Sequence, residues 1–157
     1  MENLAQPLPD GTHTVVAVSS HPMHPMLVTF PIALLICALA SDTAFVVLGD
    51  GFWARVSLWL LGVGTFMGAL AGVAGTIELL SVAGIRQRAA AWNHFVMAVM
   101  LLAVGFINWL SRLPDAETAI FPIGIYLSFL GALLVALAGW LGGKLVFEDR
   151  VGTLPER

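Results

Sequence analysis

Four long apolar runs constrain this chain more than any other feature of its sequence. They extend from about Met26 to Leu48, from Trp53 to about Leu80, from Ala90 to Leu113 and from about Ala119 to Val146. Each run reaches the ~20 residues that a helix needs to cross the hydrocarbon core of a bilayer. Because no water satisfies backbone groups at that depth, such runs must be helices. The runs therefore predict an all-α integral membrane protein.

The composition supports the same class and excludes others. Of the 157 residues, 59% are hydrophobic and only 11% are charged, whereas about 25% of a soluble domain is charged. The formal net charge of -3 argues against a nucleic-acid binder, which needs a clustered basic face. The single cysteine, Cys37, lies in the first apolar run and excludes a disulfide framework.

Short connections between the runs set the order of packing. Residues 49–51 and 114–117 leave room only for tight hairpins, so neighbours in sequence should be neighbours in space. We expect a four-helix up-down transmembrane bundle over residues 21–148. Residues 1–20 form an N-terminal tail that we expect to be flexible, without the pattern of a cleavable signal peptide, and residues 149–157 form a C-terminal tail.

The distribution of Lys and Arg predicts the orientation. The side with both termini and the second connection has five such residues: Arg86, Arg88, Lys144, Arg150 and Arg157. The opposite side has two, Arg55 and Arg112. Since positive charge concentrates on the cytoplasmic side, we expect both termini in the cytoplasm.

A histidine layer is predicted at one end of the bundle. His24 opens the first run, Glu78 lies near the end of the second, and His94 lies about one turn into the third. In an up-down bundle these three side chains share one depth, and we expect them within about one helix diameter, ~10–12 Å.

A charge pair is predicted at the other end. Asp42 lies ~27 Å along its helix from His24, and Arg112 is displaced equally from His94, at a rise of 1.5 Å per residue. A lone charge near hydrocarbon is costly, so Asp42 should pair. Equal depth favours Arg112 as its partner over Arg55, which follows the first hairpin.

Two His-Pro steps mark the start of the first helix, as His21-Pro-Met-His24-Pro, and Pro31 follows within the helix. Pro31 removes the bond to the carbonyl of Leu27, so the helix should be kinked or begin twice. Either arrangement leaves carbonyls near His24 that can orient its imidazole. We therefore expect substitution to matter most at His24 and to be silent at His13, in the tail.

Three chemical interpretations of the histidine layer remain open. In the first, His24 and His94 are axial ligands of a b-type haem, with His21 beside them. In the second, four side chains hold a divalent metal: His21, His24, Glu78 and His94. In the third, which the residues alone favour, the histidines form a polar cap with Arg86 and Arg88 and bind no ligand.

Glycines recur at four-residue spacing in two of the runs. They are Gly64, Gly68 and Gly72 in the second run and Gly139 and Gly143 in the fourth. Such stripes allow close approach of a helix or a flat cofactor, and helix packing is the stronger explanation. No nucleophile–base arrangement, phosphate loop or CxxC pair is present, so an enzyme is not the expected class.

Several segments together resemble a known family. The segments HPMHPMLVTFPIALL, SDTAF, AWNHF, INWLSR and GWLGGKLVFEDRVG are similar to the bacterial membrane proteins of the domain of unknown function 2231 family. The resemblance implies a four-helix membrane domain in the bacterial inner (plasma) membrane. Relatives are sometimes joined to Rieske-type iron–sulfur or cytochrome-like modules, which implies a redox setting. Many relatives have a histidine where Thr29 and Asp149 stand here, which leaves His21, His24 and His94 as matching positions.

These observations lead to one main functional hypothesis and its competitors. We expect a redox-support or electron-transfer subunit with haem b or a quinone near the histidine layer, in contact with the lipid bilayer and other membrane or redox proteins. The competing hypotheses are a cofactor-free structural or assembly subunit, which could be a homo-oligomer, and a divalent-metal-binding protein. Transport is disfavoured because no inverted repeat or broken central helix is evident.

Overall fold

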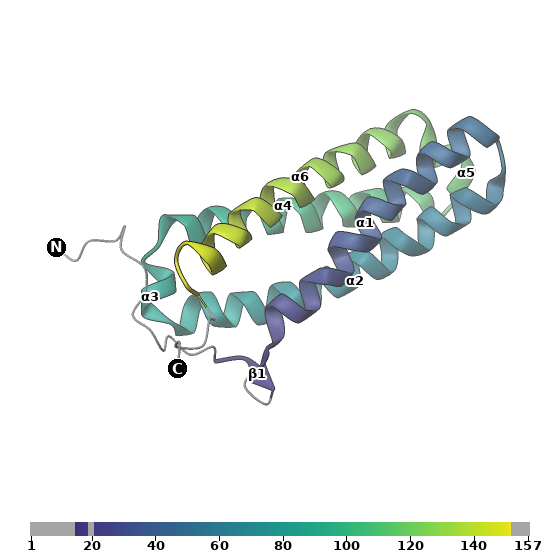
Figure 1. The fold of residues 1–157 in the computed structure, drawn as a ribbon. Helices are drawn as coiled ribbons and strands as arrows, with labels where there is room; N and C mark the ends of the chain where they lie inside the picture. The colour runs from purple at the N-terminus through teal and green to yellow at the C-terminus, as the bar shows by residue number, and fades with distance from the viewer. Residues whose placement is uncertain (1–14, 19–20, 152–157) are drawn as a thin grey trace.

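Four long helices dominate the computed structural model, which describes residues 15–18 and 21–151 (Figure 1). They are α1 (Met23–Leu48), α2 (Gly51–Ser81), α4 (Ala89–Arg112) and α6 (Ile125–Phe147). Together with the short α5 (Ala116–Ala119), α6 completes a fourth stretch long and apolar enough to span a membrane. The prediction of an all-α membrane protein is confirmed, and the predicted runs lie within about three residues of the observed spans.

The short elements lie outside the predicted runs or interrupt them. Strands β1 (Ala17–Val18) and β2 (His21–Pro22) pair antiparallel just before α1, and α3 (Ala83–Arg86) lies between α2 and α4. The π-helical turn η1 (Ile120–Gly124) separates α5 from α6. Phe121 has extended backbone angles there, so the fourth run is not one continuous helix.

Local chemistry fixes the first hairpin. Gly49 ends α1 at a φ of 67°, a left-handed conformation that glycine adopts without steric cost. Asp50 then begins α2, because its side chain accepts a hydrogen bond from the backbone N–H of Phe52 at 2.8 Å. The chain therefore reverses direction within two residues.

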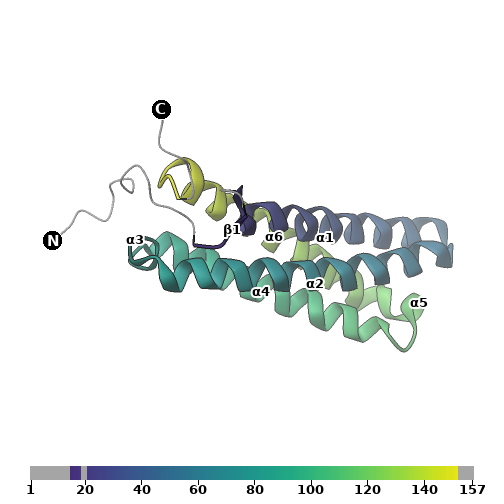
Figure 2. The same cartoon turned by 90° about the horizontal axis from the view of Figure 1, so that it is seen from below.

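The helices pack in a ring in which α1 and α4 each contact both α2 and α6 (Figures 1 and 2). Small residues on α2 allow the close approach. A Cβ at Gly64 would contact Leu34 and Leu35 of α1, and a Cβ at Gly68 would contact Pro31. These glycines therefore act in helix packing, as expected for the second run.

One of the two forms predicted for the first helix is excluded. α1 is one helix from Met23 to Leu48 with Pro31 inside it, so it does not begin twice. The ring of Pro31 packs near Gly68 of α2.

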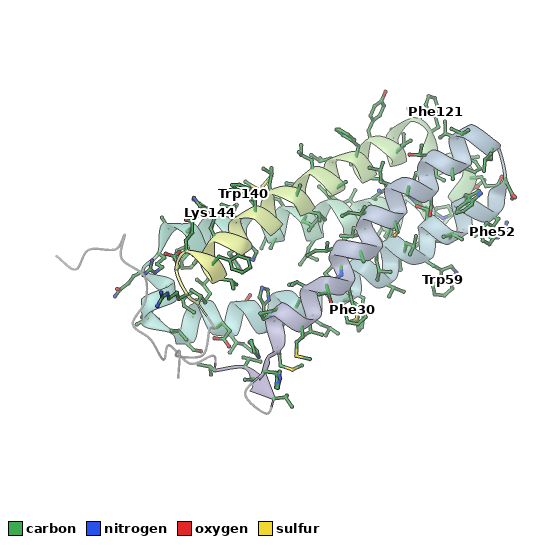
Figure 3. The ribbon with its side chains drawn as sticks, viewed as in Figure 1. Phe30, Phe52, Trp59, Phe121, Trp140 and Lys144 are labelled. Carbon is green, nitrogen blue, oxygen red and sulfur yellow. The ribbon has the colours of Figure 1, made fainter. Side chains whose placement is uncertain are left out.

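Large apolar side chains cover the outside of the bundle. Figure 3 shows Phe30, Trp59, Phe121 and Trp140 on its outer surface, and between 52% and 73% of each residue is exposed. Such a surface is unfavourable in water and suited to hydrocarbon. The protein therefore lies in a lipid bilayer as a multi-pass membrane protein.

Candidate functional site

The charge pair is completely buried at the end of the bundle where α1 meets α2. Arg112 Nη1 donates to Asp42 Oδ1 at 2.6 Å, and Nη2 donates to Oδ2 at 2.7 Å. Both residues have 0% exposure. This two-pronged geometry matches the planar guanidinium to the carboxylate. The structure thus places Asp42 against Arg112, while Arg55 is exposed.

Two serines complete the shell of the carboxylate. Ser57 of α2 donates to Asp42 Oδ1 at 2.5 Å, and Ser128 of α6 donates to Oδ2 at 2.6 Å. On the guanidinium side, Arg112 Nε donates to Asn108 Oδ1 at 3.0 Å. All four long helices therefore contribute a side chain to one hydrogen-bonded cluster, which we call the charge cluster: Asp42, Ser57, Asn108, Arg112 and Ser128.

The interruption of the fourth run supplies the last partner of the charge cluster. Asn108 Nδ2 donates to the carbonyl of Gly124 at 3.3 Å, and Gly124 closes η1. A Cβ at Gly124 would lie 2.5 Å from the Ala119 carbonyl oxygen and 3.1 Å from Arg112 Nη2. Glycine is therefore required there by close approach.

At the opposite end, His24 of α1 and His94 of α4 face each other. Their ring centroids are 6.1 Å apart and the ring planes are nearly perpendicular, at 87°. Both side chains are partly buried. Because His24 and Asp42 lie at opposite ends of α1, and their partners lie at matching ends of α4, these two helices run in the same direction.

A backbone carbonyl orients each imidazole. His24 Nδ1 lies 2.8 Å from the carbonyl oxygen of Ala71 on α2, and His94 Nδ1 lies 2.9 Å from that of Ala138 on α6. The expectation that proline-freed carbonyls of the first helix orient His24 is therefore wrong. The acceptor belongs to the neighbouring helix, because the histidine points across the interface.

The two histidines have equivalent settings in the two helical hairpins. A glycine lies four residues after each alanine whose carbonyl accepts this bond, Gly75 after Ala71 and Gly142 after Ala138. A Cβ at Gly75 would lie 2.8 Å from His24 Nδ1, and one at Gly142 would lie 3.1 Å from His94 Cε1. Each imidazole thus packs against a helix at a glycine, where no side chain intervenes. The histidine layer therefore contains the same histidine–carbonyl–glycine arrangement twice.

This geometry determines what the imidazoles can do. A carbonyl oxygen only accepts hydrogen bonds, so Nδ1 of each ring carries the hydrogen. In a neutral imidazole the other nitrogen, Nε2, then has a free lone pair. His24 and His94 therefore each have one ring nitrogen that could bind a metal or accept a hydrogen bond, and the hydrogen bond at Nδ1 orients each ring.

Glu78 and His21 lie at the same end without completing a metal site. Glu78 Oε1 accepts from the N–H of Val16 at 2.8 Å, and Oε2 is buried with no hydrogen-bond partner among the described residues. His21 is an exposed residue of β2. Within residues 15–18 and 21–151, no three His, Cys, Asp or Glu side chains are close enough to hold one metal ion. The four-residue metal set is not assembled.

The arginines expected in a polar cap have other partners. Arg88 forms an ion pair with Asp149, and Arg86 donates to the carbonyl of Leu80 at 2.8 Å. These contacts join neighbouring elements at this end of the bundle. His13, for which no role is expected, lies outside the described residues.

Sequence reasoning missed the groups that hold both layers in place. Ser57 and Ser128 are small polar residues within apolar runs, where serines are common. The carbonyls of Ala71 and Ala138 cannot be recognised in a sequence, because every residue has a backbone carbonyl. A comparison of the two halves of the chain offers a signal, since an alanine followed by a glycine four residues later occurs on α2 and again on α6.

The family described as "Predicted membrane protein (DUF2231)" matches residues 20–155. The chain belongs to this family. The match extends over all four spans and both polar layers, and the membership confirms the resemblance seen in the sequence. No curated protein and no solved structure matches the chain.

Proposed function

We propose that this protein is a redox-support subunit of the bacterial inner membrane in which His24 and His94 bind an electron-carrying group. The observation that carries the proposal is the matched pair of imidazoles, each with Nδ1 on a helix carbonyl and each with Nε2 left for a ligand. A b-type haem is the first group that this donor set would suit, because imidazoles from different helices of a bundle commonly hold haem iron.

The two rings lie close together at one end of the bundle. Their centroids are 6.1 Å apart, which is the distance of a direct edge-to-face contact. His24 and His94 would hold the iron, and the haem would supply one-electron chemistry when bound. A quinone is the second ligand of the proposal, since Nε2 can accept a hydrogen bond from a quinol hydroxyl.

The proposal includes an orientation with both termini in the cytoplasm. Arg112 is buried in the charge cluster. It is therefore left out when the positive charges on the two sides of the membrane are compared. Arg88 is also buried and paired, with Asp149. Among the described residues, the histidine end then has the exposed Arg86, Lys144 and Arg150, and the opposite end has the exposed Arg55. The positive-inside rule therefore favours the histidine end on the cytoplasmic side.

A reduced-minus-oxidised absorbance spectrum tests the proposal. The protein should be produced with haem available, purified in detergent and extracted for quinone. We expect haem bands, or a bound quinone, that disappear in His24→Ala and His94→Ala and persist in the matched variant His21→Ala. All variants should elute as the wild type does in size exclusion. A colourless and quinone-free protein would refute the proposal.

A cofactor-free structural or assembly subunit is the second candidate. The observation in its favour is the charge cluster, whose buried hydrogen-bonding side chains link all four helices without a ligand. Such a subunit would bind other membrane proteins through its apolar exterior. The same spectrum separates the candidates, because this one predicts no ligand in the wild type or in any histidine variant.

A further inference from the structure

Two adjoining cavities lie on the outside of the bundle near the end of α6. The first has a volume of about 340 Å³ and is lined by Gln87, Ala89, Ala90 and four charged residues, Arg88, Lys144, Glu148 and Asp149. The second has a volume of about 310 Å³ and is lined mainly by Gly139, Trp140, Gly143 and Phe147. Lys144 and Glu148 line both cavities, so a polar cavity continues into an apolar groove.

The apolar groove exists because its floor lacks side chains. A Cβ at Gly139 would meet nothing within 4 Å, and one at Gly143 would meet only Phe147 of the same helix, at 4.0 Å. These glycines therefore do not pack against another helix of this chain, unlike Gly64 and Gly68 of the second run. Trp140 and Phe147 flank the groove and are 73% and 85% exposed.

The polar cavity combines charges of both signs. Arg88 is paired with Asp149. Lys144 Nζ lies 3.6 Å from Glu148 Oε2, which is longer than the ~2.7–2.9 Å of a charge-assisted hydrogen bond. Both groups therefore have hydrogen-bonding capacity left for a ligand. Ala89 and Ala90, in the first turn of α4, also line this cavity, and helix N-termini favour anionic groups.

We propose that these two cavities bind one membrane phospholipid whose headgroup has a phosphate and a primary ammonium, as in phosphatidylethanolamine. Lys144 and the first turn of α4 bind the phosphate, Glu148 binds the ammonium, and an acyl chain lies in the groove over Gly139 and Gly143. Figure 3 shows Trp140 and Lys144 close together on the outer side of α6. They lie near the end of the last span, where acyl chains meet headgroups.

The arrangement of charge selects the headgroup. Phosphatidylglycerol has the phosphate but no ammonium for Glu148. Phosphatidylcholine has a quaternary ammonium without N–H groups, so it cannot donate a hydrogen bond to the carboxylate. The structure therefore assigns the strongest binding to the ethanolamine headgroup.

Native mass spectrometry of the purified protein in detergent tests the assignment. Each of the three phospholipids is added at the same concentration, and retained lipid is counted. We expect phosphatidylethanolamine to be retained most strongly, as one molecule per chain. Lys144→Gln should weaken its apparent affinity roughly fivefold, since it removes a charge-assisted hydrogen bond to the phosphate.

A groove-filling variant tests the acyl-chain contact. Gly139→Leu adds a side chain into open space, so the fold should persist while the affinity falls about tenfold through lost burial of methylene groups. Gly143→Leu provides a second variant if the first does not fold. Ala69→Leu, at an exposed position of α2, is the matched control and should bind as the wild type does.

Three outcomes would overturn the proposal. If the groove variants retain as much phosphatidylethanolamine as the control, the acyl-chain site is refuted. If phosphatidylglycerol or phosphatidylcholine is retained as well as phosphatidylethanolamine, the contact with Glu148 is refuted. If Lys144→Gln binds phosphatidylethanolamine as the wild type does, the phosphate site is refuted. None of these measurements depends on the histidines.

Discussion

Arg112 and Asp42 lie 70 residues apart in sequence and form a two-pronged ion pair with both side chains completely buried. An ion pair in a low-dielectric interior must recover the cost of removing two charges from water, and it does so only with good geometry and additional hydrogen bonds. Ser57, Ser128 and Asn108 provide those bonds. The pair therefore acts as a fixed connection between α1 and α4.

Removal of one partner of this pair should destabilise the bundle strongly. Asp42→Ala leaves the guanidinium of Arg112 buried without its counter-charge, and we expect a loss of about 3 kcal/mol in the free energy of unfolding. The double variant Asp42→Ala/Arg112→Met should be more stable than the sum of the single effects predicts, by ~1–3 kcal/mol. Unfolding of the purified protein in detergent measures all four corners of the cycle.

The exposed Arg55 provides the control for this cycle. Asp42→Ala and Arg55→Met should be additive, because Arg55 lies outside the charge cluster. Coupling of Asp42 to Arg55 as large as its coupling to Arg112 would contradict the arrangement described above.

The serines of the charge cluster should matter through their hydroxyl groups. Ser57→Ala and Ser128→Ala each remove a hydrogen bond to the buried carboxylate, and we expect each to cost about 1–2 kcal/mol in unfolding free energy. Ser111→Ala is the matched control, because Ser111 donates only to the carbonyl of Asn108 on its own helix. Thermal unfolding midpoints that fall equally in all three variants would disprove the special role of the two cluster serines.

Stability should also depend on pH through the cap of α5. Asp115 accepts hydrogen bonds from the N–H groups of Thr118 and Glu117, and these bonds hold the pKa of its carboxyl below the ordinary value. The pKa of Asp115 is lower in the folded than in the unfolded protein. Its charged side chain therefore stabilises the fold above about pH 4, and this stabilisation is lost as the pH falls through the folded pKa.

The matched variant is Asp115→Asn, which keeps a capping side chain but does not titrate. The unfolding midpoints of the wild type and of Asp115→Asn are recorded from neutral to acidic pH. The difference between them should shrink at acidic pH, because Asp115 of the wild type becomes protonated. A constant difference between the two proteins down to the most acidic pH would show that Asp115 makes no such contribution.

The sequence predicts the spans and the depth of both polar layers because helix geometry is regular. A constant rise of 1.5 Å per residue places His24 level with His94 and Asp42 level with Arg112 from their numbering alone. Charge pairing near hydrocarbon then leaves few partners for Asp42. These inferences need only length, direction and the cost of burying a charge.

Other features depend on packing that residue types do not reveal. The carbonyls of Ala71 and Ala138 orient the histidines because neighbouring helices have a particular rotation. Pro122 is present in the fourth run, but the sequence does not show that the turn it belongs to offers a carbonyl to Asn108. The outward direction of Gly139 and Gly143 also follows from helix rotation, since spacing alone does not distinguish a packed stripe from an open groove.

The glycine beneath His24 leads to the last prediction. Gly75→Ala places a methyl group 2.8 Å from His24 Nδ1, so the ring must move and its bond to the Ala71 carbonyl must lengthen. We expect a cost of ~1–3 kcal/mol in unfolding free energy from this overpacking. Gly142→Ala should cost less, because its Cβ would lie 3.1 Å from His94. Unfolding in detergent measures both effects.

Gly72→Ala is the control for this comparison, because its added Cβ would meet only Leu102 of α4 at an ordinary 3.5 Å. Alanine has the higher helix propensity, so this variant should be neutral or stabilised by up to about 1 kcal/mol. If the protein binds a ligand through His24 and His94, Gly75→Ala should also weaken that binding while Gly72→Ala leaves it unchanged. Equal stability of the Gly72 and Gly75 variants would show that the ring of His24 is free to move, and the orientation of its Nε2 would then be undetermined.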